Sequence, residues 1–242
     1  MGIAMNHADH TKTPAILIVG ASSGIGHAMA AEFSKRGWNV VGTARHLTDH
    51  TELHDLAAQS GGRVEAEAVD ICEPDQITAL RARLAGRVFD IVFVNAGTAN
   101  ADPTETIAEV STEEFVTVMV TNALGPMRTI EALQDLVPAD GLIGVMSSGQ
   151  GSITNNIKGG FEVYRGSKAA LNQNMRSYAA RHAGNPRALL LMAPGWIRTA
   201  LGGPDATFSL EETVPDIVNT VLAKRGTPGL AYLDRMGHTV PW

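Results

Sequence analysis

Short, almost wholly apolar runs alternate with longer amphipathic stretches along most of this chain. The runs 15–20 (AILIVG), 39–44 (NVVGTA) and 141–148 (GLIGVMSS) have the length of strands and contain few polar residues. A strand that is apolar on both faces must be buried on both faces, which a parallel sheet between two layers of helices achieves. Regular alternation of strands and helices is typical of a doubly wound α/β fold.

The same alternation predicts about seven strands, with helices on both faces, in one Rossmann-like domain. The other strands are expected at 63–70, 89–97, 187–195 and 229–234, and the helices at 24–36, 51–60, 74–85, 111–136, 163–183 and 210–224. We expect Pro215 to interrupt the last helix, because proline lacks the N–H that a helix interior uses. The length of 242 residues fits one such domain. We therefore expect a flexible leader at 1–13 and a Rossmann-like domain at 14–242.

Composition and charge argue against several classes of protein. The chain has 19 basic and 25 acidic residues, and this net charge of −6 does not favour nucleic-acid binding. No apolar run approaches the roughly 18 residues of a membrane span, and the first residues lack the apolar core of a signal peptide. Cys72 is the single cysteine, and no Cys/His cluster predicts a metal site. We therefore expect a cytoplasmic protein without a metal ion.

A glycine-rich turn, GASSGIG (20–26), follows the first expected strand and opens the first expected helix. Gly20, Gly24 and Gly26 let the backbone turn sharply and approach a ligand closely. The N-terminus of the helix offers free N–H groups and a positive potential to a pyrophosphate. A strand–helix turn without a ligand is the alternative.

Tyr164 and Lys168 are four residues apart at the start of the long helix at 163–183, and so lie on one helix face. An ammonium beside a phenol favours the phenolate and lowers the pKa of the tyrosine, which suits acid–base catalysis near neutral pH. An ordinary surface pair has the same spacing.

Two further polar features stand out, one at the end of the fifth strand and one inside the helix that precedes that strand. Ser147 and Ser148 end the fifth strand, where a hydroxyl could hydrogen-bond a substrate carbonyl or simply cap a turn. Asn122 lies inside a predicted helix and is followed by Gly125 and Pro126. This pattern indicates a local kink with an inward polar side chain, or else an exposed asparagine without a role.

Taken together in chain order, these segments resemble the short-chain dehydrogenase/reductase family over residues 14–242. The matching pieces are GASSGIG (20–26), NAG (95–97), Asn122, SSGQG (147–151), YRGSK (164–168) and PGWIRT (194–199). The stretch GSITNNIKGG between the serine and the tyrosine, together with YRGSKAALN, LGGPDA and VPW, is similar to the C-factor and Sniffer-like carbonyl reductase branch.

The resemblance implies catalytic roles for Asn122, Ser148, Tyr164 and Lys168. Tyr164 would be the general acid in carbonyl reduction, and Ser148 would position and polarise the carbonyl. Lys168 would lower the pKa of Tyr164 and hydrogen-bond the nicotinamide ribose, while Asn122 would hold a water that connects Lys168 to solvent. Ser148 is preferred to Ser147 because the family places its catalytic serine three residues before a glycine, here Gly151.

The resemblance also implies a nucleotide-binding surface. Its expected residues are Gly20, Ser22, Ser23, Gly24, Ile25, Gly26, Arg45, Asp70, Ile71, Asn95, Ala96, Gly97, Tyr164, Lys168, Pro194, Gly195, Ile197 and Thr199. Asp70 and Ile71 would contact the adenine, and Asn95, Ala96 and Gly97 would pack beside the adenosine ribose. Ile197 and Thr199 would meet the carboxamide and the phosphates. Val19 stands where the family usually has threonine, which removes one hydroxyl from the turn.

The end of the second strand predicts which cofactor is used. An acidic residue there would accept from the ribose 2′-OH and favour NAD, but Ala44 occupies that position. Arg45 follows and could pair with a 2′-phosphate through charge-assisted hydrogen bonds. NADP(H) is therefore expected in preference to NAD(H), unless Arg45 is only a solvated surface residue.

These features predict an NADPH-dependent oxidoreductase that acts on a small-molecule carbonyl or alcohol. A dinucleotide-binding signalling or regulatory protein is the alternative, and an enoyl reductase would be expected to space its tyrosine and lysine more widely. The substrate should contact 150–160 and 200–210, where Trp196 and Phe208 indicate either an apolar pocket or core packing. The resemblance further implies a homo-oligomer.

Overall fold

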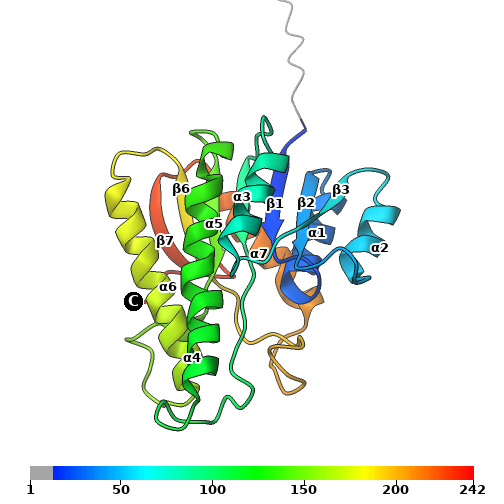
Figure 1. The fold of residues 1–242 in the computed structure, drawn as a ribbon. Coiled ribbons are helices and arrows are strands. Elements are labelled where there is room, and N and C mark those ends of the chain that lie inside the picture. The colour runs from blue at the N-terminus through cyan, green and yellow to red at the C-terminus, as the bar shows by residue number, and fades with distance from the viewer. Residues whose placement is uncertain (1–12) are drawn as a thin grey trace, which may run out of the picture.

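Seven parallel strands form one sheet in the computed structural model, which describes residues 13–242 (Figure 1). Their order is β3-β2-β1-β4-β5-β6-β7. The strands are β1 (Ala15–Val19), β2 (Asn39–Ala44), β3 (Val64–Ala68), β4 (Ile91–Val94), β5 (Leu142–Met146), β6 (Ala188–Ala193) and β7 (Gly229–Asp234). The doubly wound, single-domain fold that the sequence predicts is confirmed. The expected leader at 1–13 lies almost wholly outside the described residues.

Helices cover both faces of the sheet. They are α1 (Gly24–Lys35), α2 (Glu52–Gln59), α3 (Pro74–Arg83), α4 (Thr112–Met119), α5 (Gly125–Leu133), α6 (Glu162–Arg181) and α7 (Leu210–Lys224). Shorter turns of helix are η1 (Val120–Leu124), η2 (Gln134–Leu136) and η3 (Gly149–Gly151). Helices α1, α2 and α7 pack on one face, and α3, α5 and α6 on the other.

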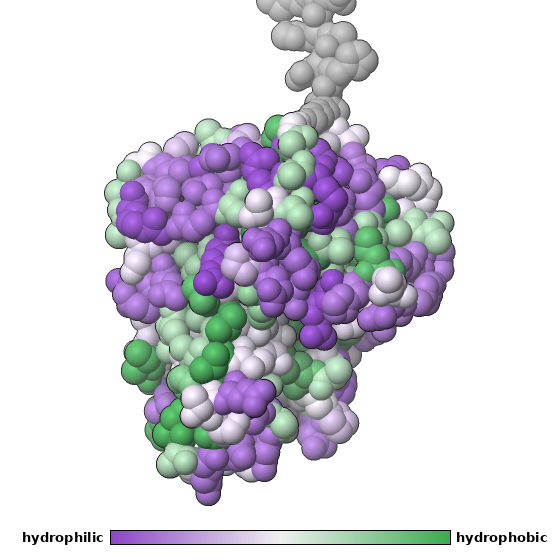
Figure 2. All heavy atoms as spheres, viewed as in Figure 1, coloured by the Kyte–Doolittle hydropathy of each residue, from purple (hydrophilic) through white to green (hydrophobic). Residues whose placement is uncertain are grey.

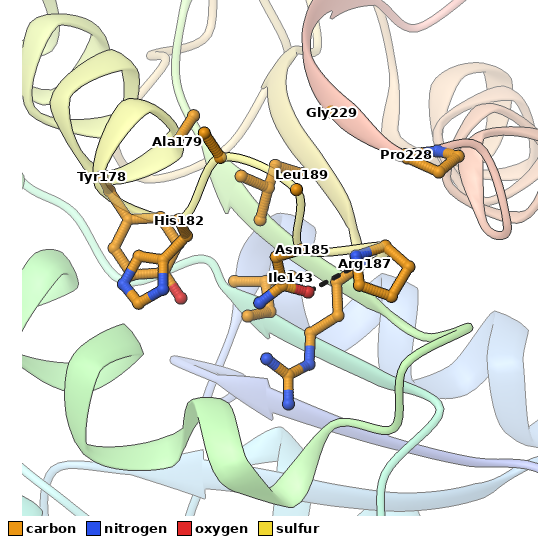
Figure 3. A pocket seen from close by; sticks show the side chains of 12 residues that line it. Ile143, Tyr178, Ala179, His182, Asn185, Arg187, Leu189, Pro228 and Gly229 are labelled. Atoms are coloured by element: carbon orange, nitrogen blue, oxygen red, sulfur yellow. Dashed lines mark hydrogen bonds between the residues drawn. The ribbon is translucent and has the colours of Figure 1, made fainter.

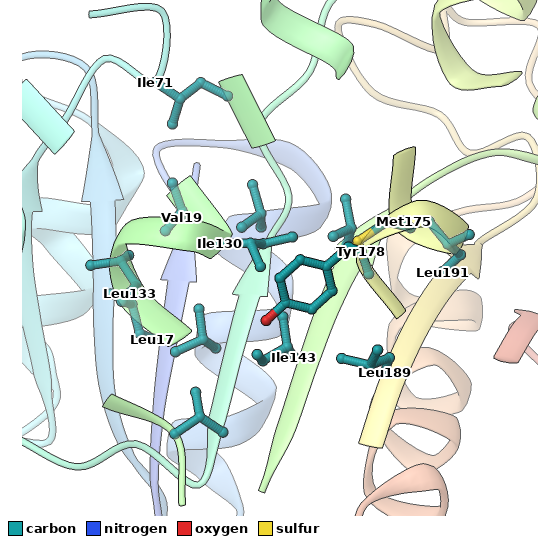
Figure 4. Packing of buried hydrophobic residues seen from close by; sticks show 14 of the residues in the cluster. Leu17, Val19, Ile71, Ile130, Leu133, Ile143, Met175, Tyr178, Leu189 and Leu191 are labelled. Carbon is teal, nitrogen blue, oxygen red and sulfur yellow. The ribbon is translucent and has the colours of Figure 1, made fainter. Parts of the chain in front are cut away.

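Alternate side chains of each central strand enter opposite layers of the core. In β1, Leu17 and Val19 face α5 and α6, while Ile16 and Ile18 face α1 and α7. Figure 4 shows the first of these layers, in which Ile130 of α5 and Tyr178 of α6 pack over the sheet. The apolar runs of the sequence are apolar throughout because both of their faces are covered.

The structure corrects two expectations about helices. The expected helix at 111–136 is α4, a π-helical turn (η1), α5 and a 3₁₀ turn, so the kink at Asn122 takes the form of a π-turn. The expected interruption at Pro215 is wrong, since α7 runs unbroken from Leu210 to Lys224. Pro215 lies in the second turn, where its missing N–H costs only one bond to the carbonyl of the exposed Glu211.

A complete capping box begins α7. The Ser209 hydroxyl accepts from the Glu212 N–H at 3.2 Å, and the Glu212 carboxylate accepts from the Ser209 N–H at 2.8 Å. Both bonds satisfy backbone donors that the first helical turn leaves without a partner. This cap explains how the helix starts firmly in spite of the proline that follows.

Replacing the cap should therefore destabilise the fold measurably. Ser209→Ala is expected to lower the free energy of unfolding by about 1 kcal/mol, as measured by urea titration. Ser177→Ala is the control, because Ser177 is an exposed residue inside α6, where alanine is the better helix former. Equal losses in the two variants would show that the cap does not stabilise α7.

Candidate functional site

The residues that the sequence singles out gather beyond the carboxyl ends of the strands. Gly20 follows β1, Asn95 follows β4, Ser148 follows β5 and Pro194 follows β6, while α6 brings Tyr164 to the same edge. Ligands of open parallel sheets bind at this edge. The fold therefore assembles side chains that are far apart in the sequence.

The glycine-rich turn needs glycine at the positions where its backbone packs closely. Gly20 has φ +89°, and a Cβ there would lie 2.7 Å from the backbone nitrogen of Ala96. A Cβ on Gly26 would lie 2.0 Å from the carbonyl oxygen of Gly20. Side chains at these two positions would push the turn away from the sheet, so the cradle above the start of α1 depends on them.

Neighbouring strands hold this turn in place. The Gly20 N–H donates to the hydroxyl of the buried Thr43 at 3.0 Å, and the Ala21 N–H donates to the Thr43 carbonyl at 2.7 Å. The Asn95 amide donates to the Gly20 carbonyl at 2.7 Å. Thr43 was not expected to take part, although a buried hydroxyl in the apolar run 39–44 was a usable signal. The Thr43 hydroxyl reaches the turn from β2 and bonds Gly20. Gly20 follows Val19, the position at which the family usually has a threonine hydroxyl.

The start of α1 has the chemistry of an anion site. Its N-cap, Ser23, makes no side-chain capping bond, and the first turn carries no acidic residue. The N–H groups and the positive end of the helix dipole are therefore free to meet a phosphate. Thr199, from the segment after β6, flanks this turn, because a Cβ on Gly24 would lie 3.6 Å from its methyl group.

The Ser148 and Tyr164 side chains lie close enough together for the Ser148 hydroxyl to lower the pKa of the Tyr164 phenol. Burial raises the pKa of Tyr164 by more than Ser148 lowers it, so the net shift is upward. Ser147 points elsewhere, since its buried hydroxyl donates to the Asn172 side chain at 2.6 Å. The geometry thus favours Ser148 over Ser147, as expected from its distance to Gly151.

Lys168 is buried beneath this pair, with 3% of its surface exposed. Its Nζ donates to the Met146 carbonyl at 3.0 Å and lies 5.8 Å from the centroid of the Tyr164 ring. Burial lowers the pKa of Lys168 to about 8. The expected lowering of the Tyr164 pKa by Lys168 is not what this geometry gives, because burial of the phenol has the larger effect.

Asn122 is wholly buried in the π-turn, so the exposed alternative is excluded. Its side-chain oxygen accepts from the Thr98 N–H at 2.8 Å, and its side-chain nitrogen donates to the Thr98 carbonyl at 2.7 Å and to the Ser167 hydroxyl at 2.9 Å. A Cβ on Gly97 would lie 3.2 Å from both Asn122 Oδ1 and Lys168 Nζ. The side chain of Asn122 thus ties the loop after β4 to the lysine helix.

The residues expected around the adenosine differ in how exposed their side chains are. Arg45 is exposed directly after β2 and makes no ion pair with any residue in 13–242, and Ala44 before it is buried. The Asp70 carboxylate accepts from the Cys72 N–H at 2.8 Å. The Ile71 side chain is buried in the core beside Gly125, so a contact of Ile71 with the adenine would be made by its backbone.

Exposed apolar side chains surround the same edge. Ile107, Phe161, Trp196 and Leu201 lie on the loops after β4, β5 and β6, and each is at least 41% exposed. In Figure 2, apolar surface is concentrated in the lower half of the view, where these strands end, and the upper half is mostly hydrophilic. Trp196 is therefore not packed into the core, which was the alternative to a pocket role.

A further hollow lies at the opposite edge of the sheet. It has a volume of about 450 Å³ and is lined by residues that include Tyr178, His182 and Arg187 (Figure 3). Ile143 and Gly229, which also line it, lie at the amino ends of β5 and β7. Within residues 13–242 no cluster of metal-ligating side chains is found, and no helix is long and apolar enough to cross a membrane.

Known proteins resemble the chain over its whole described length. Residues 20–226 match a family model described as enoyl-(acyl carrier protein) reductase. A short-chain dehydrogenase/reductase of Burkholderia multivorans with bound NADP is 64% identical, with a TM-score of 0.94, over 96% of this chain and 100% of that one. A carbonyl reductase of Pseudomonas aeruginosa PAO1 in complex with NADP is 33% identical, with a TM-score of 0.88, over 96% and 100% of the two chains.

The C-signal protein of Myxococcus xanthus is 30% identical over 155 residues, which are 63% of this chain and 92% of that protein. This relative and the carbonyl reductase confirm the branch that the motifs indicate. The chain belongs to the short-chain dehydrogenase/reductase family of NAD(P)-dependent oxidoreductases.

Proposed function

We propose that this protein transfers a hydride between NADP(H) and a carbonyl or alcohol, with Tyr164 as the general acid or base. The observation that carries the proposal is the placement of the Ser148 and Tyr164 side chains beside each other, with the buried Lys168 ammonium 5.8 Å from the centroid of the Tyr164 ring. Bound NADPH would supply the hydride to the carbonyl carbon. The Tyr164 phenol gives its proton to the carbonyl oxygen, and the product is the alcohol.

The Ser148 hydroxyl orients the substrate in this scheme. It is partly exposed, contacts the Tyr164 side chain and accepts only from the Gln150 N–H at 3.1 Å on its other side. A carbonyl oxygen placed between Ser148 and Tyr164 would receive two hydrogen bonds as negative charge develops on it. The raised pKa of Tyr164 keeps the phenol protonated at neutral pH, which is the form that a reductase needs.

The proton that Tyr164 gives up is returned through Lys168 and a water held by Asn122. Pro126 has no N–H, so the main-chain carbonyl of Asn122 lacks the donor that an α-helix would place four residues on. The side-chain amide of Asn122 is already bonded to Thr98. We therefore assign the expected water-holding role to the main-chain carbonyl of Asn122.

The nucleotide fits a cradle that the chain itself shapes. The turn at 20–26 leaves no room for side chains at Gly20 and Gly26, and the first turn of α1 has free N–H donors. A pyrophosphate would lie there, with Ser22 and Ser23 beside it. The exposed Arg45 guanidinium stands two residues after Thr43, which itself bonds the turn, and would pair with a 2′-phosphate.

Two rival functions remain distinguishable by experiment. Similarity to C-signal favours a regulatory protein that binds a dinucleotide, but such a protein has no need of a tyrosine beside Ser148. The description of the matching family model favours an enoyl reductase, whose tyrosine and lysine would be spaced more widely than Tyr164 and Lys168.

We further propose a cytoplasmic homo-oligomer, on the basis of the family resemblance and the free thiol of Cys72.

Loss of the phenol hydroxyl should abolish most turnover. Tyr164→Phe is expected to lower kcat for carbonyl reduction by about 10²–10⁴-fold and to leave the dissociation constant of NADPH nearly unchanged. Steady-state kinetics and a fluorescence titration of NADPH measure the two quantities. Tyr178→Phe is the control, because Tyr178 is buried far from Ser148 and bonds Gln134. Near-normal reduction by Tyr164→Phe would refute the mechanism.

Replacing Lys168 should raise the stability of the fold and lower the activity. The folded-state pKa of about 8 lies below the ordinary value of 10.5, so at pH 7 the folded chain holds a charge that burial disfavours. Lys168→Met should therefore be more stable than wild type by about 3 kcal/mol below pH 8, and this advantage should disappear as the pH rises to about 10.5. Urea titrations between pH 6 and pH 10.5 measure the difference.

The same variant should lose turnover and bind NADPH more weakly, because one ammonium is assigned to both roles. The exposed Lys35→Met, in the last turn of α1, is the matched control and should change neither stability nor activity appreciably. A Lys168→Met protein that is less stable than wild type at pH 7 would contradict the assigned cost of burial. Unchanged nucleotide affinity would remove the ribose contact.

Arg45 should determine the preference between the two nucleotides. Arg45→Ala is expected to weaken NADPH binding about ten- to a hundredfold and NADH binding little, because a charge-assisted hydrogen bond contributes about 1.5–3 kcal/mol. Ala44→Asp should shift the preference further toward NADH, since a carboxylate repels the 2′-phosphate. Dissociation constants for both nucleotides test this. Equal losses in Arg45→Ala, or a wild type that prefers NADH, would refute the assignment.

A further inference from the structure

Beyond Ser147, the catalytic segment is no longer held by the sheet. The Ser147 N–H donates to the Met192 carbonyl at 2.8 Å, continuing the pairing of β5 with β6. Ser148 then leaves the sheet in an extended conformation and caps the 3₁₀ turn η3. The position of its hydroxyl therefore depends on contacts made outside the β-ladder.

Tyr232, in the middle of β7, supplies such a contact. Its hydroxyl donates to the Ser148 carbonyl, which also accepts from the Gly151 N–H at 2.9 Å. Tyr232 is only 1% exposed, and its ring lies in the core layer under α6. It also lies close enough to Tyr164 to influence the pKa of that phenol. The hydroxyl thus fixes the backbone of Ser148 directly behind the proposed proton donor.

Trp242 holds both Tyr232 and the segment that follows Ser148. The rings of Tyr232 and Trp242 have centroids 5.4 Å apart, and the Arg176 guanidinium covers the indole at 4.5 Å. The Trp242 carbonyl accepts from the Thr154 N–H at 3.0 Å and from the Thr154 hydroxyl. The Val240 N–H donates to the Tyr232 carbonyl at 2.9 Å, which keeps 238–242 against β7.

We propose that Tyr232 and Trp242 form a clamp that positions Ser148, so that Tyr232 is a positioning residue for the reaction. This inference rests on the proposed function of Ser148 and Tyr164. The clamp fixes the 148–164 segment at Ser148 through the Tyr232 hydroxyl and at Thr154 through the Trp242 carbonyl. Tyr232 touches no substrate atom in this account, and its effect on the rate passes through Ser148.

Two matched tyrosine variants test the clamp. Tyr232 and Tyr178 are each 1% exposed, and each hydroxyl makes a hydrogen bond, to Ser148 and to Gln134 respectively. Tyr232→Phe and Tyr178→Phe should therefore lose similar amounts of stability. Only Tyr232→Phe should lower kcat, by about tenfold, which is less than the 10²-fold that a 1 Å misplacement can cost. The NADPH dissociation constant should not change in either variant.

A double-mutant cycle shows whether the effect passes through Ser148. In a Ser148→Ala background, Tyr232→Phe should lower kcat by less than about twofold, because the hydroxyl that it positions is already absent. A loss of kcat that is equally large in both backgrounds would overturn the proposal. So would a kcat for Tyr232→Phe that equals that of Tyr178→Phe.

Hydrogen exchange gives a readout that needs no turnover. Amides in 148–154 should exchange faster in Tyr232→Phe and in Trp242→Ala than in wild type, and Trp242→Phe should restore protection by keeping an aromatic ring against Tyr232. Unchanged exchange in Tyr232→Phe would overturn the clamp whatever the activity. Failure of the proposed function appears separately, as near-normal carbonyl reduction by Tyr164→Phe.

Discussion

Burial of the parallel sheet on both faces is the constraint on which the rest of the structure depends. The four strands β1, β4, β5 and β6 are almost wholly enclosed by apolar layers. Polar side chains can therefore reach a ligand only where these strands end. That edge holds the glycine turn after β1, Ser148 after β5 and the segment after β6. Helix α6 brings Tyr164 and Lys168 to the same edge.

The electrostatics of the site follow from the same burial. Desolvation raises the pKa of Tyr164 and lowers that of Lys168, so each shift favours the neutral form. A protonated phenol at neutral pH suits carbonyl reduction, and alcohol oxidation would need the phenolate that higher pH provides. The buried ammonium is retained at a cost in stability, which is typical of a group kept for chemistry and not for folding.

The sequence predicts the chemistry-bearing positions better than their partners. The number of strands, the doubly wound architecture, the glycine turn and the common helix face of Tyr164 and Lys168 follow from periodicity, spacing and a family resemblance. The bond from Tyr232 to Ser148 could not be predicted, because the neighbours of β7 are known only once the sheet is built. The polar Thr43 in an apolar strand was a usable signal for a buried hydroxyl, but its partner in the turn also depends on the strand order. Continuity of α7 through Pro215 was missed because the capping box at Ser209 was not weighed against the proline.

The central claim is that the edge of the sheet transfers a hydride and does not merely bind a nucleotide. Deuterium placed at the reactive C4 position of NADPH traces that transfer directly. Incubation with an aldehyde, followed by mass spectrometry of the products, should show an alcohol with one deuterium on its carbinol carbon, and Tyr164→Phe should form it far more slowly. NADPH that binds tightly while no carbonyl tested yields deuterated alcohol would contradict the account and would favour a regulatory dinucleotide-binding protein.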